Sequence, residues 1–149
     1  MAALLLIAHE PLASAFAQVA THAFPDCGSR LRFIDVAANA SPEALEQEVR
    51  AAVATLAPQE VLILVDAFGA TPCNVAMRVA DGTQVRVVAG VSVPMLWRSL
   101  CYADESLDRL VPRAVDGAVQ GALQVSSPRR LNQSHSFPPH AQDPHHDQQ

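Results

Sequence analysis

Lysine is absent from the sequence, and all ten basic residues are arginine. Fifteen aspartate and glutamate residues outnumber them, which leaves a formal net charge of -5 at pH 7. Proteins that bind nucleic acid use a positively charged surface to neutralise phosphates. The shortage of positive charge therefore argues against nucleic acid as a partner.

Long hydrophobic runs are missing as well. No stretch reaches the roughly 18 to 20 consecutive apolar residues that span a bilayer, so direct membrane insertion is not expected. The apolar N-terminal run, residues 2–8, has no basic leader and continues directly into His9 and Glu10. This arrangement argues against a signal peptide and favours a cytoplasmic location.

Cysteine is scarce, with three residues in a chain of 149. An odd number of cysteines without the spacing of metal ligands is typical of a protein from a reducing compartment. We therefore expect neither a bound metal nor a cofactor. The three cysteines are Cys27, Cys73 and Cys101.

Apolar residues make up half of the chain, but they are nearly absent from its end. Residues 126–149 contain only Leu131, Phe137 and Ala141 as apolar residues, together with four of the six histidines and four of the eleven prolines. Such a segment cannot bury enough surface to offset the entropy lost on ordering. We expect one folded domain over residues 1–125 and a disordered, polar tail rich in histidine, proline and glutamine over residues 126–149.

Within the expected domain, short apolar runs alternate with segments of helical period. The βαβαβαβα order predicts an open, mostly parallel, doubly wound α/β sheet with helices on both faces. Predicted strands cover residues 3–8, 31–36, 61–65 and 85–89, and predicted helices begin after Pro11, at Ser41-Pro42, at Thr71-Pro72, after Pro94 and near Ser106.

Two of these helix starts carry a recognisable signal. Ser41-Pro42 and Thr71-Pro72 each read as a capping residue followed by proline at the first helical position.

The helix after Pro11 should face the core with the apolar residues that recur every three or four positions. Those residues are Leu12, Phe16, Val19 and Ala23.

Two polar residues stand where predicted strands end. His9 follows the first predicted strand and Asp66 follows the third. In open parallel sheets the chemistry gathers at the carboxyl ends of the strands. If these two strands are neighbours, the Asp66 carboxylate can accept a proton from one ring nitrogen of His9. The other nitrogen then presents its lone pair as a nucleophile. An ordinary polar histidine at a loop mouth is the alternative interpretation.

The segment from Asp66 to Asn74 is a loop of small residues that leads into a helix. Free backbone N–H groups at such a start, together with the helix dipole, favour an anion. We therefore predict a phosphate site formed by Gly69, Ala70 and Thr71, with the Thr71 hydroxyl as a further donor. Taken alone, this loop could equally be an ordinary strand-to-helix turn.

Three motifs in order carry a family resemblance: a strand ending in His9, the run Val-Asp-Ala-Phe-Gly-Ala-Thr-Pro-Cys-Asn at 65–74, and Val-Ala-Gly-Val-Ser-Val-Pro-Met-Leu at 88–96. They resemble the enzyme IIA component of the mannose family, also called the fructose-subfamily IIA component, of the phosphoenolpyruvate-dependent sugar phosphotransferase system. The similarity covers nearly all of residues 1–125.

This resemblance implies a phosphotransferase that works through a phosphohistidine. His9 would take a phosphoryl group from the phosphocarrier HPr, Asp66 would orient the ring, and Thr71 would contact the phosphate. Members of the family are cytoplasmic, are usually homodimers, and pass the phosphoryl group to a IIB component during sugar transport. A regulatory role with the same phosphohistidine is a further possibility.

The chain departs from the family pattern beside the active histidine. Glu10-Pro11 follows His9 where glycine is common, and Phe68 stands where tryptophan is frequent. The Glu10 carboxylate would repel an incoming phosphoryl group if it pointed toward it. Alternatively, Pro11 could place Glu10 at the N-terminus of the helix, where its charge favours the helix dipole and can meet a cation on HPr.

Two other functions remain open from the residues. A metal chelatase of tetrapyrrole synthesis could use the strand-end His9 for its metal, although it needs further ligands, and His22 is the one other histidine of the expected domain. The phosphoryl-donor subunit of a dihydroxyacetone kinase would use the same phosphohistidine with a different partner.

Overall fold

Strands and helices alternate along the chain, as the sequence predicts. The computed structural model describes residues 1–126, so the expected tail lies outside the described residues except for Ser126. In chain order the elements are β1 (Ala2–His9), α1 (Leu12–Ala23), the short 3-10 helix η1 (Pro25–Ser29), β2 (Leu31–Val36), α2 (Pro42–Leu56), β3 (Glu60–Val65), α3 (Thr71–Val79), β4 (Val85–Ala89), α4 (Val93–Cys101) and α5 (Leu107–Gly121).

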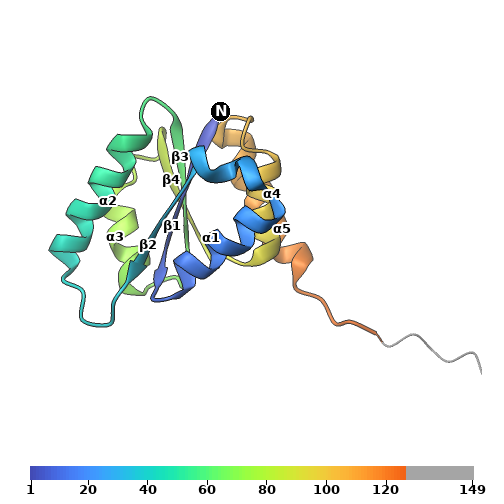
Figure 1. The fold of residues 1–149 in the computed structure, drawn as a ribbon, viewed down its shortest axis with the longest axis horizontal. Coiled ribbons are helices and arrows are strands. Elements are labelled where there is room, and N and C mark those ends of the chain that lie inside the picture. The colour runs from blue at the N-terminus through green and yellow to red at the C-terminus, as the bar shows by residue number, and fades with distance from the viewer. Residues whose placement is uncertain (127–149) are drawn as a thin grey trace, which may run out of the picture.

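The four strands form one sheet in the order β2-β1-β3-β4, and every neighbouring pair is parallel. Helices α2 and α3 cover one face, while α1, α4 and α5 cover the other (Figure 1). The predicted open, doubly wound α/β sheet is therefore confirmed. This order makes β1 and β3 neighbours, as the pairing of His9 with Asp66 requires.

The core is divided by the sheet into two apolar layers. Leu4 and Leu6 of β1 point toward α1, α4 and α5, whereas Leu5 and Ile7 point toward α2 and α3. All four side chains are fully buried. A continuous apolar run is typical of a parallel strand that is covered on both faces, and it places the end of β1 on a rigid support.

The helix after Pro11 begins where expected, but its predicted inward face is wrong. Leu12 and Val19 are 44% and 38% exposed. Instead, α1 buries Ala13, Ala17 and Ala20, with Phe16 packed beside them. These alanines recur with the same helical period, and their small side chains let α1 lie close to the sheet. Alanine carries little hydrophobic signal in the sequence, which hid this face.

The two predicted caps have different outcomes. Ser41 is the N-cap of α2, and its Oγ accepts a hydrogen bond from the Ala44 N–H at 3.3 Å. Thr71, by contrast, is already the first residue of α3; Ala70 is the N-cap and no side chain caps this helix. A threonine before proline does not identify the cap, because proline is accepted at the second helical position as well as the first.

Glycines bring the last two helices into close contact. A Cβ on Gly117 would lie 3.0 Å from the Pro94 carbonyl oxygen, and one on Gly121 would lie 2.6 Å from Pro94 Cγ. Pro94 is in the first turn of α4. The absence of side chains on these two glycines therefore lets the C-terminal part of α5 pack directly on the start of α4.

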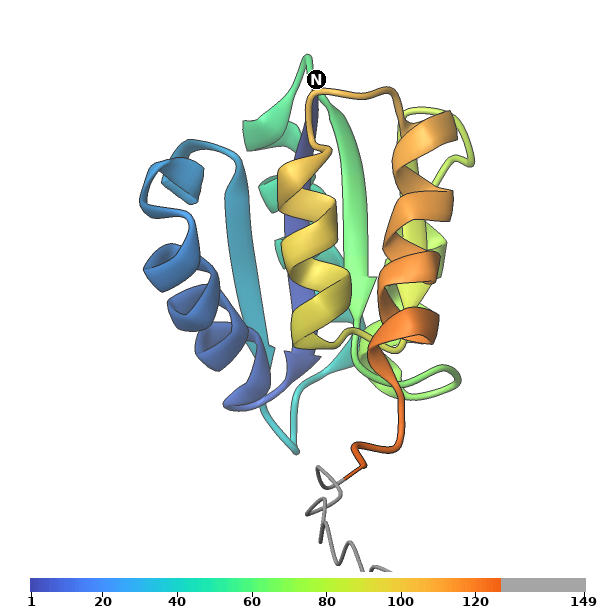
Figure 2. The ribbon, with the colours of Figure 1, turned by 90° about the vertical axis from the view of Figure 1, so that its right-hand side faces the viewer.

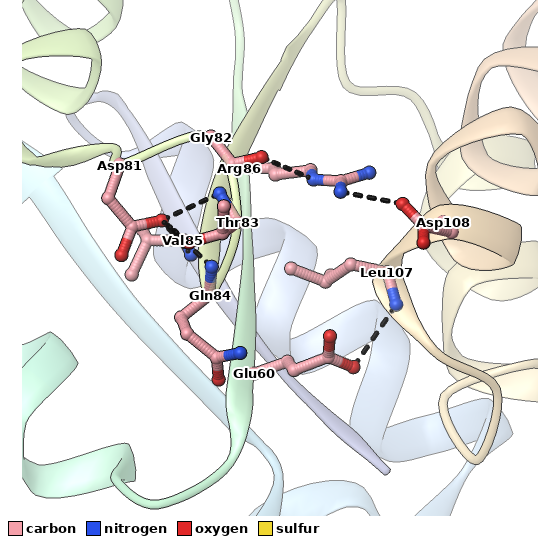
Figure 3. Close-up of polar contacts among 9 residues, drawn as sticks. All are labelled: Glu60, Asp81, Gly82, Thr83, Gln84, Val85, Arg86, Leu107 and Asp108. Atoms are coloured by element: carbon pink, nitrogen blue, oxygen red, sulfur yellow. Dashed lines mark hydrogen bonds and ion pairs between the residues drawn. The ribbon is translucent and has the colours of Figure 1, made fainter.

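Polar contacts hold α5 to the amino ends of the strands (Figure 3). The Leu107 N–H at the start of α5 donates to the Glu60 carboxylate at 3.1 Å. The Arg86 guanidinium on β4 contacts the Asp108 carboxylate at 2.6 Å. Ser106, the N-cap of α5, gives no side-chain cap, so Glu60 of β3 takes over that function.

We expect Glu60→Ala to lower the free energy of unfolding by about 1 kcal/mol, in the range of a lost N-cap. Urea unfolding followed by circular dichroism measures this change. Glu60→Gln keeps a carbonyl acceptor and should lose less. The control is Glu48→Ala, because Glu48 is exposed on α2 and makes no hydrogen bond or ion pair among the described residues. Equal stability of Glu60→Ala and wild type would contradict the capping role.

Candidate functional site

His9 is the last residue of β1 and lies between the ends of β2 and β3. Its side chain is 51% exposed, although the seven residues before it in β1 are buried. The following Glu10 N–H donates to the Val36 carbonyl oxygen at 3.0 Å, which fixes the chain just beyond the histidine. A rigid strand thus presents an accessible imidazole at the carboxyl edge of the sheet.

Asp66, directly after β3, is in contact with His9. Its Oδ2 lies 2.6 Å from the ring Nδ1 and also accepts the backbone N–H of His9 at 2.9 Å. Its Oδ1 accepts the Ala67 N–H at 2.8 Å. The side chain is only 12% exposed. Two backbone donors therefore hold the carboxylate in place against the ring.

The protonation of this pair follows from the surroundings of Asp66. Burial raises the pKa of the Asp66 carboxyl. Hydrogen bonds from the His9 backbone, the His9 ring and the Ala67 backbone lower it, and their combined effect is the larger, so the pKa lies below its usual value. An ionised carboxylate only accepts hydrogen bonds, so Nδ1 of His9 carries the proton. In the neutral ring Nε2 then keeps its lone pair, which the tautomer makes available for attack.

A second carboxylate, Asp35 of β2, supports the start of α1 just after His9, and it was not predicted from the sequence. Asp35 Oδ1 accepts the Ser14 N–H in the first turn of α1 at 3.0 Å. Ser14 Oγ in turn donates to the Pro11 carbonyl oxygen at 3.0 Å. Pro11 offers no side-chain cap of its own, so Asp35 secures the start of α1 shortly after His9. The signal in the sequence that could have indicated this contact was an aspartate near the end of a predicted strand.

The turn between β3 and α3 carries the residues of the predicted phosphate site. Gly69 adopts a φ of +82°, a conformation that favours glycine. The Asn74 side chain donates to the Gly69 carbonyl oxygen at 3.1 Å and holds the turn against α3. Among residues 1–126, the backbone N–H groups of Gly69 and Thr71 find no acceptor. Whether they bind phosphate stays a prediction.

The described loops at this edge carry no positive charge. Glu10 and Asp66 are the only charged residues in the four segments that join the strands to the next helices, residues 10–11, 37–41, 66–70 and 90–92. Across the described part of the chain, histidine, cysteine, aspartate and glutamate form no group of three that could hold a metal ion. The further ligands that a chelatase needs are thus not found there. Nor is any helix in that part long and apolar enough to cross a membrane.

Comparison with known families places this geometry in context. The model of the family EIIA-man, described as PTS system fructose IIA component, matches residues 3–115. The chain is also 38% identical over 99 residues to the PTS system mannose-specific EIIAB component of Escherichia coli (strain K12) and to that of Shigella flexneri. This match covers 64% of the chain and only 31% of each relative.

Solved structures resemble the fold. The mannose/sorbose specific IIA subunit of the phosphotransferase system from Enterococcus faecalis superposes with a TM-score of 0.77 at 22% identity, over 85% of this chain and 96% of that one. Phosphotransferase system component EIIA from Streptococcus agalactiae gives a TM-score of 0.75 at 19% identity, over 83% of this chain and 97% of that one. At such identities these neighbours establish the fold, and the residues of the site must be argued from their own geometry.

Proposed function

This chain belongs to the mannose-type family of IIA components of the phosphotransferase system, and we propose that it is a phosphoryl carrier that uses His9. The observation that carries the proposal is the exposed imidazole whose Nδ1 lies 2.6 Å from the Asp66 carboxylate. A nucleophile of this kind needs one ring nitrogen fixed and the other free to react.

Transfer from a donor phosphohistidine requires little of the protein beyond position and charge stabilisation. The Nε2 lone pair of His9 attacks phosphorus and forms a new N–P bond. The N–P bond of the donor breaks, and the donor imidazole leaves with the bonding electron pair. The Nδ1 proton stays in its hydrogen bond to Asp66, whose negative charge stabilises the ring as it becomes cationic.

The new phosphoryl group would be held by neutral donors. Gly69, Ala70 and Thr71 follow β3, the neighbour of β1, and their N–H groups stand at the N-terminus of α3. Backbone donors at a helix start favour an anion without a neighbouring cation. With no arginine in the strand-end loops, these groups and the Thr71 hydroxyl are the candidates that offset the phosphate charge.

The expected donor is the phosphocarrier HPr and the expected acceptor is a IIB component, both met in the cytoplasm. Incubation with phosphoenolpyruvate, enzyme I and HPr, followed by intact-mass measurement, tests the function directly. We expect a mass increase of one phosphoryl group, which disappears when a IIB protein is added. A protein that gains no mass while HPr is fully phosphorylated would overturn the proposal.

We propose Glu10 as an element of partner selection. Pro11 is the N-cap of α1, so Glu10 lies directly before the helix and outside its first turn. Its carboxylate is exposed and has no ion-pair partner among the described residues. It is therefore free to meet a cation on HPr.

We expect Glu10→Gln to accept phosphate up to about fivefold more slowly at low salt, since a charge pair in water is worth about 1 kcal/mol at 4 Å. The two proteins should converge at high salt, because ions screen steering. The transfer rate is measured across a salt series. A variant that is faster at every salt concentration would show that Glu10 repels the phosphoryl group instead.

A homodimer is the expected assembly, and apolar surface on α5 supports it. Val115 and Val119 lie one turn apart and are 42% and 69% exposed. They lie on the same flank of the helix as Asp108, which contacts Arg86 of the edge strand β4. One edge of β4 has no neighbouring strand in the described chain. Unpartnered apolar side chains beside an open strand edge favour association with a second copy.

We expect sedimentation velocity to give the mass of a dimer for wild type and of a monomer for Val119→Arg, because a buried guanidinium without a partner is costly. Met77→Arg is the control, since Met77 is a similarly exposed apolar residue (55%) on α3. A monomeric wild type at micromolar concentration, or equal effects of both variants, would reject this interface.

A further inference from the structure

Phe68 is the most exposed aromatic side chain of the described residues. Its exposed fraction is 82%, whereas Phe33, the next most exposed aromatic residue, is 50% exposed. Leaving an aromatic ring in water forgoes the free energy of burying it. Nothing in the fold of residues 1–126 uses this ring, so its role lies outside the packing of this domain.

Phe68 lies in the turn that begins with the partner of the reacting histidine. Phe68 comes two residues after Asp66, which contacts His9 at 2.6 Å. A protein that transfers a phosphoryl group must bring its own phosphorylated atom within bonding distance of His9 Nε2. Its surface then covers the neighbourhood of His9, and the turn that carries Phe68 belongs to that neighbourhood.

The backbone on both sides of Phe68 is fixed before any partner arrives. The Ala67 N–H donates to Asp66 Oδ1 at 2.8 Å, and the Gly69 carbonyl oxygen accepts from the Asn74 side chain at 3.1 Å. The left-handed φ of Gly69 sets the direction of the turn. A contact residue whose backbone is already ordered loses less entropy on binding.

The charges near Phe68 indicate what kind of surface fits it. The strand-end loops hold only Glu10 and Asp66 as charged residues, and Asp66 is occupied by His9. A complementary partner therefore presents apolar side chains to Phe68 and a cation to Glu10. A phosphoryl-donor protein must place its own surface over His9 to deliver the phosphoryl group, which makes it a suitable occupant of this surface.

We propose that Phe68 is the apolar anchor that docks the phosphoryl-donor protein on His9. The inference rests on the proposed phosphoryl-carrier function and names the contact that selects its donor. Aromatic residues at the centre of an interface dominate its binding energy, and their truncation commonly lowers affinity by about 30-fold or more. Phe68 thus determines how well the donor binds, while His9 and Asp66 perform the chemistry.

The test compares two phosphoryl donors. With phosphorylated HPr, Phe68→Ala should lower kcat/KM by about 30-fold, mainly through KM. Phosphoramidate transfers a phosphoryl group to imidazole without a protein surface, and with it wild type and Phe68→Ala should react equally. Phe68→Trp should restore most of the efficiency with HPr. Phe33→Ala is the matched control, because Phe33 is also exposed (50%) but lies within β2, opposite Leu6.

The possible results separate this inference from the function on which it rests. Equal efficiency of Phe68→Ala and wild type with HPr would reject the anchor and leave the carrier function intact. An equal loss with phosphoramidate would also reject it, since Phe68 would then act on the chemistry at His9. A wild-type protein that accepts phosphate from phosphoramidate but not from HPr would overturn both.

Discussion

His9→Ala should carry no acid-labile phosphate after incubation with phosphoenolpyruvate, enzyme I and HPr. The variant lacks the only imidazole that the structure places against a carboxylate within residues 1–126. The alanine leaves the hydrogen bond from the residue 9 backbone to Asp66 in place, and the His9 side chain is half exposed, so the fold should persist. Radiolabelled phosphate, quantified after separation from HPr, measures the effect, which should be complete.

His22→Ala is the natural control for that experiment. His22 lies in the last turn of α1 and is exposed, so its loss should leave phosphorylation unchanged. Circular dichroism of both variants checks that the fold is intact. Undiminished labelling of His9→Ala would show that another residue receives the phosphoryl group, and the assignment of His9 would be withdrawn.

Asp66→Asn should keep the fold but slow the phosphorylation of His9. The asparagine amide can donate a hydrogen bond to Nδ1 and so stabilise the tautomer that carries its proton on Nε2, where attack must occur. The same substitution costs about 10⁴-fold in a serine-protease triad. We expect a smaller loss here, about 10²-fold, because the transfer needs no proton relay and the carboxylate partner of a metal-bound histidine, which orients its ring in the same way, contributes about 10- to 100-fold.

Asp35→Asn provides the comparison for this variant. Asp35 also accepts a backbone N–H at a strand end, but its donor is Ser14 of α1, and an asparagine oxygen can still accept that bond. Measured rates of phosphoryl transfer to His9 should therefore be nearly those of wild type for Asp35→Asn and slow for Asp66→Asn. If both variants react at the wild-type rate, the orienting role of Asp66 is wrong.

The regular pattern of apolar residues was enough to predict the sheet. The boundaries of β2 and β4 match the predicted ranges, 31–36 and 85–89, because β-branched and leucine residues in short runs mark strands that helices cover. The meeting of His9 with Asp66 could also be predicted, since their strands end at the same edge and only their adjacency had to be assumed.

Contacts between elements far apart in sequence could not be predicted in this way. The cap that Glu60 provides to α5 spans 47 positions, and the cap that Asp35 provides to α1 spans 21. Neither produces a local pattern of residues, because the partner on the other side is a backbone N–H that every residue type carries. The sequence also could not show whether Thr71 is the cap or the first residue of α3, because both positions tolerate the same residues.

The close packing of Gly121 on Pro94 determines where the chain leaves the domain. Pro94 follows the carboxyl end of β4, so α5 ends at the same edge of the sheet as β1 (Figure 2). His9 is the last residue of β1 and lies at that edge. A domain tethered after residue 126 would start its path on the reactive side. Delivery of the phosphoryl group to such a tethered acceptor would be an intramolecular step, governed by linker length and effective concentration and independent of how dilute the protein is.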